Sequence, residues 1–254
     1  MTHLRFSVFS KGLGFPVDME ALMPENSVDI PTLWLFHGAN RDGSEWIGQS
    51  SLPRYLSGRK LAVITISVFN GFYVDMHRGA AYGTYLEQEW IPTVRNLLPC
   101  LSVKRKKNYI AGASMGGFGA FRIAMNRPEV FSKAGAFAGS IEMPTIIERN
   151  QRGLQPGGPD FGWAFGGYEN MINNRNDVIH MAKQCADRKM IPELYMVCGK
   201  DDFGYALNTI ARDDLRKAGA DVVWRQCEGI HSFDCWDPEL PLFLDWLEGK
   251  ETNA

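Results

Sequence analysis

Hydrophobic and polar positions follow one another along this chain in distinct blocks. Residues 32–36 and 61–66 are short, continuously apolar runs, as expected of strands buried on both faces of a sheet. Residues 4–9 alternate between apolar and polar positions, and residues 17–23 follow after a glycine-bearing turn. These last two segments predict an antiparallel hairpin at one edge of the sheet.

The rest of the chain alternates between strand-like and helix-like patterns. We expect further strands at residues 109–113, 133–139, 194–198 and 222–225, and helices at residues 85–98, 119–126, 177–189, 205–217 and 240–247. Pro92 should kink or interrupt the first of these helices. Regular alternation of this kind predicts a doubly wound, mostly parallel sheet with helices on both faces.

Residues 151–167 interrupt the alternation. Glycine and proline are so frequent there that we predict no regular element. Because the pattern resumes afterwards, we interpret the segment as an excursion within one domain rather than a linker between two. The 254 residues then form a single α/β domain spanning residues 1–254.

Composition narrows the class of protein. Apolar residues make up 45% of the chain and charged residues 22%, and the net charge of −2 argues against a nucleic-acid-binding surface. We find neither a signal-peptide pattern nor an apolar run long enough to span a membrane. The five cysteines form no C-x-x-C pair, which predicts reduced thiols packed as small hydrophobic residues in a cytoplasmic protein.

The segment 112–116, Gly-Ala-Ser-Met-Gly, carries the strongest chemical signal. It fits G-x-S-x-G and lies between a predicted strand and a predicted helix, which is the pattern of a nucleophile elbow. Ser114 would occupy a strained turn that exposes its hydroxyl, and glycines on both sides would prevent collisions with the neighbouring strand and helix. The start of the helix would direct free N–H groups and its positive dipole end toward a developing oxyanion.

A serine at an elbow needs a base and an acid that follow it in the chain. His231 follows the last predicted strand, and we favour it over His37, which precedes the serine and can shape its own loop by bonding to backbone. Asp201 and Asp202 both follow the strand at residues 194–198, and spacing alone leaves the choice between them open.

An oxyanion hole should combine two backbone N–H groups. The pattern predicts that of Met115 and one from the loop after residue 36, with Ala39 as the first choice and Asn40 as the alternative. No spacing typical of metal ligands or of a nucleotide-binding loop occurs, so we expect neither a metal nor a cofactor.

Taken together, these motifs resemble the esterase D / tributyrin esterase family of α/β-hydrolases, which is related to acetyl-xylan and feruloyl esterases and to S-formylglutathione hydrolase. The resemblance covers almost the whole chain and rests on the following segments: 36–38 with Trp46, 70–73, 111–117, 165–167 leading to 176–177, 198–203, and 229–233 with Trp236.

The resemblance implies an eight-stranded α/β-hydrolase fold, with Asp202 as the acid and Ala39 as the second oxyanion donor. It also implies an esterase that forms an acyl-enzyme and takes a small-molecule ester, with the excursion near its active site. The aromatic side chains around the site favour short acyl groups, from acetyl to butyryl, on tributyrin-like or acetylated-sugar substrates. We expect the substrate to contact Asn40, Trp46, Phe72 and Tyr73.

Two other interpretations stay open. One is a thioesterase of the S-formylglutathione hydrolase type, and the other is a catalytically silent binding protein that keeps the hydrolase fold. Three filled positions for a catalytic triad count against the silent protein. Whether the chain forms a homo-oligomer is a separate open question.

Overall fold

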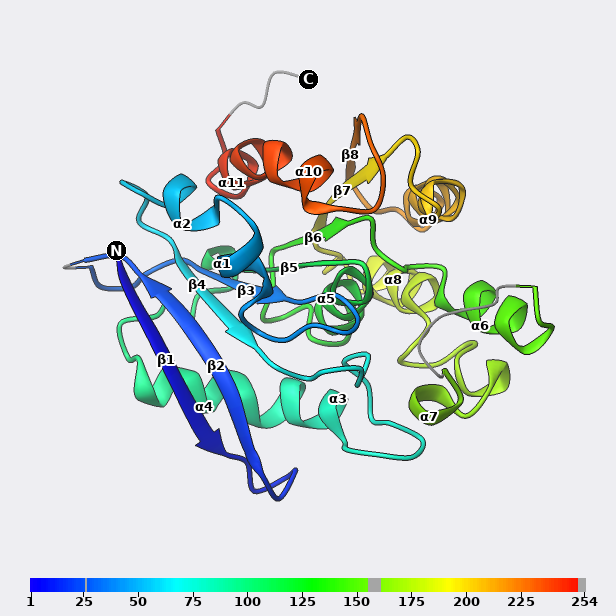
Figure 1. The fold of residues 1–254 in the computed structure, drawn as a ribbon, viewed down its shortest axis with the longest axis horizontal. Coiled ribbons are helices and arrows are strands. Elements are labelled where there is room, and N and C mark those ends of the chain that lie inside the picture. The colour runs from blue at the N-terminus through cyan, green and yellow to red at the C-terminus, as the bar shows by residue number, and fades with distance from the viewer. Residues whose placement is uncertain (26, 155–160, 251–254) are drawn as a thin grey trace.

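A computed structural model describes residues 1–25, 27–154 and 161–250. Its centre is one eight-stranded sheet with the strand order β1-β2-β4-β3-β5-β6-β7-β8 (Figure 1). The strands are β1 (Thr2–Phe9), β2 (Pro16–Met23), β3 (Thr32–Phe36), β4 (Ala62–Ile66), β5 (Asn108–Ala113), β6 (Lys133–Phe137), β7 (Glu193–Gly199) and β8 (Val222–Cys227).

The sheet is parallel except at one edge. β1 pairs with β2, and β2 pairs with β4, in antiparallel register, whereas every other neighbouring pair is parallel. The predicted edge hairpin and the mostly parallel, doubly wound α/β architecture are therefore confirmed. Because β3 to β8 run in the same direction, their carboxyl ends meet at one edge, where sheets of this kind place their sites.

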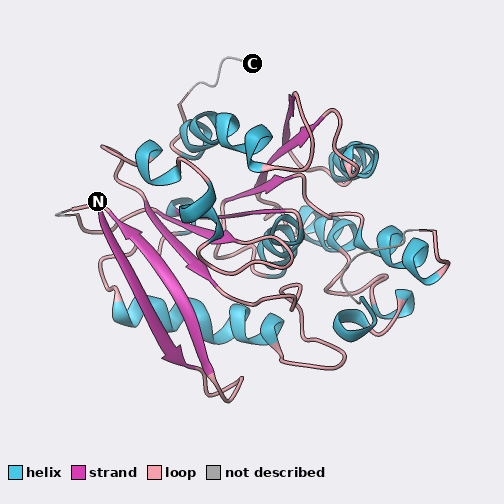
Figure 2. Cartoon of the chain, in the orientation of Figure 1, coloured by secondary structure: helices cyan, strands magenta, loops and turns pink. Residues whose placement is uncertain are grey.

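Helices cover both faces of the sheet (Figure 2). They are α1 (Glu45–Gln49), α2 (Leu52–Tyr55), α3 (Tyr82–Tyr85), a π-helical turn (Leu86–Trp90), α4 (Ile91–Leu97), α5 (Met115–Asn126), α6 (Met143–Gln151), α7 (Phe161–Phe165), α8 (Val178–Asp187), α9 (Tyr205–Lys217), α10 (Phe233–Trp236) and α11 (Leu240–Leu247). Short 3-10 turns lie at Arg105–Lys107, Tyr168–Asn170 and Asp237–Glu239.

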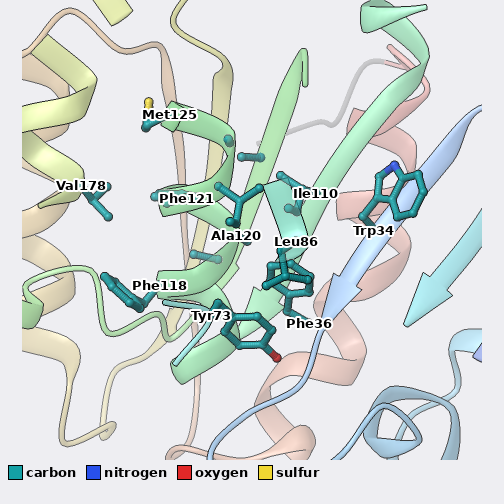
Figure 3. Packing of buried hydrophobic residues seen from close by; sticks show 14 of the residues in the cluster. Trp34, Phe36, Tyr73, Leu86, Ile110, Phe118, Ala120, Phe121, Met125 and Val178 are labelled. Atoms are coloured by element: carbon teal, nitrogen blue, oxygen red, sulfur yellow. The ribbon is translucent and has the colours of Figure 1, made fainter. Parts of the chain in front are cut away.

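Alternate residues of the central strands feed two separate hydrophobic cores, one on each face. Trp34 and Phe36 of β3 point toward α3, α4, α5 and α8, whereas Leu33 and Leu35 point toward α1, α2, α10 and α11. Figure 3 shows the first core, in which the rings of Phe36 and Tyr73 lie close together. Both strand faces are buried, which explains why the sequence of β3 is continuously apolar.

The helical segment before β5 differs from the prediction. It begins at Tyr82 and contains a π-helical turn that ends at Trp90, two residues before Pro92. Proline has no N–H to donate and its ring collides with the carbonyl four residues earlier, and a π turn is one way to accommodate such a break.

Four other helices also differ from the prediction. α5 begins at Met115, directly after the elbow serine, rather than at Gly119. The sequence pattern missed α6 and α10 entirely. The prediction that residues 151–167 hold no regular element is wrong at Phe161–Phe165, where α7 forms, and residues 155–160 lie outside the described residues.

The cysteine prediction also needs correction. Cys227, at the end of β8, forms a disulfide with Cys235 in α10, whose Cα lies 5.9 Å away. The turn between the two elements brings the cysteines together, and their spacing of eight matches no short motif. Cys185 and Cys198 are free and buried, as expected of cysteines packed as hydrophobic residues.

Candidate active site

Ser114 lies in a strained turn between β5 and α5. Its backbone has φ 53° and ψ −116°, a conformation that non-glycine residues rarely adopt outside functional sites. The turn is held by a hydrogen bond from the Ser114 N–H to the carbonyl of Phe137, at 2.8 Å.

The two glycines of the motif are sterically required. A Cβ on Gly112 would lie 2.4 Å from the Gly116 backbone, and a Cβ on Gly116 would lie 2.5 Å from the Phe36 carbonyl oxygen. Glycine at both positions therefore allows β5, α5 and the end of β3 to approach one another closely.

His231 and Asp202 form a hydrogen-bonded pair. The Nδ1 atom of His231 lies 2.7 Å from Oδ2 of Asp202, whose side chain is completely buried. The other carboxylate oxygen of Asp202 accepts the N–H of Gly204 at 2.7 Å, which fixes the orientation of the group. Asp201, in contrast, is exposed. The aspartate that contacts His231 is therefore Asp202, the one that the family resemblance indicates.

Backbone contacts join the loop that carries Asp202 to the loop that carries His231. Lys200 N–H donates to the Cys227 carbonyl at 2.9 Å, and Asp201 N–H donates to the Gly229 carbonyl at 3.1 Å. A Cβ on Gly199 would lie 2.3 Å from that same Gly229 oxygen, so this approach also depends on glycine.

The His231 ring is held by neighbouring aromatic side chains. Trp236 lies edge-on to it at 5.0 Å between ring centroids, and Phe203 lies at 4.5 Å on a tilted plane. With Nδ1 engaged by Asp202, the Nε2 atom is the nitrogen left for chemistry.

A second loop, after β3, brings backbone N–H groups to the same region. Ala39 and Met115 both line the pocket that contains Ser114. As the first residue of α5, Met115 has an N–H without an acceptor inside its own helix. The Ala39 N–H has no acceptor among the residues that the structure describes.

His37 holds the loop before Ala39 through hydrogen bonds to backbone groups. Val68 N–H donates to its Nε2 at 3.1 Å, so Nδ1 carries the proton and donates to the Gly38 carbonyl at 2.7 Å. Burial lowers the pKa of His37 to about 4, which keeps the ring neutral. This is the loop-shaping role that the sequence offered as the alternative to catalysis.

Glu45 is a buried carboxylate that sequence reasoning missed. Its Oε2 accepts the Gly38 N–H at 2.6 Å, and Arg41 approaches the other oxygen at 3.6 Å. Burial raises its pKa, and it lines the Ser114 pocket. No sequence pattern indicated that α1 would bring this carboxylate against the loop after β3.

The pocket above Ser114 has a volume of about 400 Å³, within the range of small-molecule sites. Ser114 and His231 both line it, although no hydrogen bond joins their side chains among the described contacts. Catalytic hydrogen bonds are often long before substrate binds. Apolar side chains form much of the wall: Phe72, Ile146, Phe161, Phe203, Phe233 and Trp236.

Of the four predicted substrate contacts, only Phe72 lines this pocket. Trp46 is fully buried and donates its indole N–H to the Phe36 carbonyl at 2.8 Å, so it supports the loop instead. Tyr73 is also fully buried, with its hydroxyl donating to the His37 carbonyl at 2.9 Å. Asn40 lines a neighbouring pocket. The prediction is therefore wrong for Trp46 and Tyr73, because both side chains turn into the core.

α7 packs beside the pocket. Its backbone accepts hydrogen bonds from the loop after β4, from His77 N–H to the Ala164 carbonyl and from Arg78 N–H to the Trp163 carbonyl. This docking places Phe161 in the pocket wall, 5.5 Å from the Phe72 ring.

Within the described residues, no group of three or more histidine, cysteine or acidic side chains is arranged to hold a metal ion. The same part of the chain contains no helix with the length and hydropathy needed to cross a membrane.

Comparison with known proteins identifies the family of this chain. A model of the protein family described as "Putative esterase" matches residues 10–246. The chain belongs to this esterase family. Among curated proteins, an acetyl esterase of Caldicellulosiruptor saccharolyticus is 28% identical over 239 residues, which are 91% of this chain and 90% of the relative.

Solved structures support the fold. The fluorophosphonate-binding serine hydrolase FphF and the S-formylglutathione hydrolase FrmB, both from Staphylococcus aureus, each match with a TM-score of 0.84 and 24% identity. Each match covers 97% of this chain and 98% of the other. The protein is thus an esterase with the α/β-hydrolase fold.

Proposed function

We propose that this esterase hydrolyses short-chain acyl esters, from acetyl to butyryl, through an acyl-enzyme formed on Ser114. The observation that carries the proposal is the strained Ser114 turn in the wall of a pocket that also contains His231, itself paired with buried Asp202. Strain of this kind persists only where the surrounding structure enforces it, and it concentrates at functional sites.

In the proposed reaction, the Ser114 hydroxyl oxygen attacks the ester carbonyl carbon while Nε2 of His231 takes its proton. The N–H groups of Ala39 and Met115 hold the resulting oxyanion. The imidazolium then protonates the leaving alkoxide, and the alcohol departs. Water, activated by the same nitrogen, cleaves the acyl-enzyme and releases the carboxylic acid. Asp202 orients His231 and stabilises its charged form.

The size and chemistry of the pocket support the proposed preference for short acyl groups. Phe72, Ile146 and Phe161 line the pocket, whose volume is about 400 Å³. Each added methylene that finds no apolar space forgoes about 0.8 kcal/mol of favourable transfer. The acetyl esterase among the relatives supports the same class of substrate.

A panel of p-nitrophenyl esters of rising chain length tests this proposal. We expect kcat/KM to be highest from acetyl to butyryl and to fall steeply beyond about six carbons. Ser114→Ala should lower kcat by several orders of magnitude without unfolding the protein, and a fluorophosphonate should label Ser114 once.

Three results would contradict the proposal. One is a kcat/KM that rises out to decanoate, and another is labelling at Ser140 in place of Ser114. S-formylglutathione turnover far above that of every oxyester would move the protein to the thioesterase class.

A further inference from the structure

The disulfide between Cys227 and Cys235 joins the two ends of the loop that carries His231. β8 ends at Cys227, and α10, which lies beside β8 in Figure 1, contains Cys235. His231 lies four residues from each cysteine, so the bridge closes a small covalent ring with this histidine at its far side. The proposed base is therefore held between two covalently linked points.

Much of this loop is exposed. Glu228 and Ile230 both face solvent, and Ile230 is 62% exposed. Near the end of the loop, Phe233 packs edge-on against Trp46, at 5.1 Å between ring centroids. The end that leaves β8 is held by the disulfide and by the backbone hydrogen bonds from the loop of Asp202. The disulfide is thus a principal anchor of the loop.

The bridge also borders the loop that carries Asp202. A Cβ on Gly199 would lie 3.2 Å from Sγ of Cys235, so this sulfur rests against the end of β7. The carbonyl of Cys227 accepts the Lys200 N–H at 2.9 Å. Both cysteines thus contact the backbone that leads directly to Asp202.

Cys235 is also adjacent to the residue that packs against the His231 ring. That residue is Trp236, which lies edge-on to the ring at 5.0 Å between centroids. Two thiols cannot approach as closely as two bonded sulfur atoms, so reduction forces the cysteines apart. Since Cys235 is only 2% exposed, whereas Cys227 is partly exposed, the start of the loop has more freedom to move. We expect this movement to shift His231 relative to Asp202.

The other cysteines are unsuited to opening the bridge. Burial raises the pKa of the Cys198 thiol to about 12 and raises that of Cys185 as well, so both stay protonated and unreactive at neutral pH. Cys100 lies at the opposite edge of the sheet, where its carbonyl accepts the Ile30 N–H next to the amino end of β3. A reductant must therefore come from outside the chain, and partly exposed Cys227 is the cysteine that it can reach.

We propose that the Cys227–Cys235 disulfide is a reversible redox site whose reduction by a dithiol displaces His231 and lowers the esterase activity. This inference rests on the proposed function, in which His231 is the base. The site acts on catalysis through the position of the histidine and not through contact with the substrate.

Reduction proceeds by thiol–disulfide exchange. A thiolate of the dithiol attacks Sγ of Cys227, the bond to Cys235 breaks, and Cys235 leaves as a thiolate that takes up a proton. The second thiolate of the reductant then attacks the reductant sulfur of the mixed disulfide, and Cys227 leaves in the same way. The two electrons and the two protons come from the dithiol, which ends as a cyclic disulfide.

Kinetics before and after reduction test the proposal. The native enzyme is treated with dithiothreitol, which is removed under nitrogen before p-nitrophenyl acetate is added, because free thiols attack the ester themselves. The thiols titrated after denaturation should rise from three to five. We expect kcat to fall about 10- to 100-fold, as for a base displaced by about 1 Å, with KM changed less than about twofold. Oxidised glutathione should restore kcat.

Proton NMR gives a readout that is independent of turnover. The Nδ1 proton of His231, in its 2.7 Å hydrogen bond to Asp202, should give a signal at low field, away from the backbone amides. This signal should be present in the oxidised protein, broaden or vanish on reduction, and return on reoxidation. Its absence from His231→Gln protein assigns it.

Two variants control for other effects of the reductant. Cys227→Ser/Cys235→Ser protein, with its fold checked by circular dichroism, should have the kcat of the reduced wild type and no response to dithiothreitol. Cys100→Ser is the matched control, because Cys100 is also partly exposed but unbridged. It should keep the full response. If the double variant does not fold, the reduced wild type and its NMR signal decide the question.

Three outcomes would overturn the redox site: an unchanged kcat with all five thiols free, a bridge that dithiothreitol does not open in the folded protein, and a loss of kcat that reoxidation does not reverse. If the oxidised enzyme does not hydrolyse p-nitrophenyl acetate at all, the proposed function fails. The thiol titration and the NMR signal of His231 then still decide whether the bridge controls the position of the histidine.

Discussion

Protonation of His37 should destabilise the fold as the pH falls. The ring is buried and both nitrogens are committed, with Nε2 accepting from Val68 N–H and Nδ1 donating to the Gly38 carbonyl. A proton added at Nε2 would face another N–H group and would remove that hydrogen bond. The folded protein therefore holds this histidine neutral, with its pKa lowered to about 4.

The size of the effect follows from linkage. In the unfolded chain this histidine has a pKa near 6.5, so between pH 6.5 and about 4 the unfolded state binds more protons than the folded state. The contribution of neutral His37 to the free energy of unfolding is fully present above pH 6.5 and is lost as the pH falls toward 4. The expected loss is about 2 kcal/mol by pH 5 and about 3 kcal/mol by pH 4.

Urea unfolding followed by tryptophan fluorescence from pH 8 to pH 4 measures this loss. The stability advantage of the wild type over His37→Gln should shrink by the amounts given above, since the variant lacks the titrating group. Other groups, including buried Glu45, titrate in both proteins and cancel from the difference to first order. Coincident fluorescence and circular dichroism transitions would justify a two-state treatment.

Tyr73→Phe provides a matched control. It removes the hydroxyl that donates to the His37 carbonyl at 2.9 Å but leaves the imidazole in place. This change should lower the free energy of unfolding by about 1 kcal/mol at every pH, without the acid-dependent trend. A constant difference between wild type and His37→Gln down to pH 4 would mean that the folded protein protonates His37 freely, and the reasoning would fail.

Three further changes test other contacts. Asp202→Asn should lower kcat by orders of magnitude, whereas Asp201→Asn, at an exposed position, should have little effect; equal, small losses would place the acid elsewhere. Glu45→Ala removes the acceptor of the Gly38 N–H and should lower kcat about 10- to 100-fold, whereas Glu45→Gln should retain most activity. A change in KM with kcat unaffected would refute a role of Glu45 in positioning the loop. Replacing Cys227 and Cys235 together by serine should lower the free energy of unfolding by about 2–3 kcal/mol in urea, and unchanged stability would show that the bridge is absent in solution.

The sequence predicted best those elements whose patterns arise from burial on a sheet. The strand over residues 32–36 was predicted with its observed bounds because every side chain in it is buried. α9 and α11 were also predicted with their observed bounds. α6 was missed because its residues combine apolar, charged and amide side chains, and the helix is stabilised by tertiary contacts that no local pattern records.

Prediction of site residues was limited by the direction of side chains. Motif spacing placed Ser114, His231 and the Asp201–Asp202 pair near one edge, but it could not tell that Trp46 and Tyr73 turn into the core. Glu45 was overlooked because its side chain was expected to face solvent. A carboxylate at the start of a short helix is ordinarily exposed, and this one is buried because α1 packs against Gly38.

The serine elbow and the loop after β3 depend on the same close contact. A side chain on Gly116 would meet the carbonyl oxygens of both Phe36 and His37, at 2.5 and 2.6 Å. The latter oxygen also accepts the Tyr73 hydroxyl, and the Phe36 oxygen accepts the Trp46 indole N–H. The aromatic residues that were expected to contact substrate thus fix the backbone that precedes Ala39, while the motif glycine lets that backbone rest against α5. Because the Ala39 and Met115 N–H groups belong to these two touching segments, their mutual position is set by buried backbone contacts and not by the exposed loop surface.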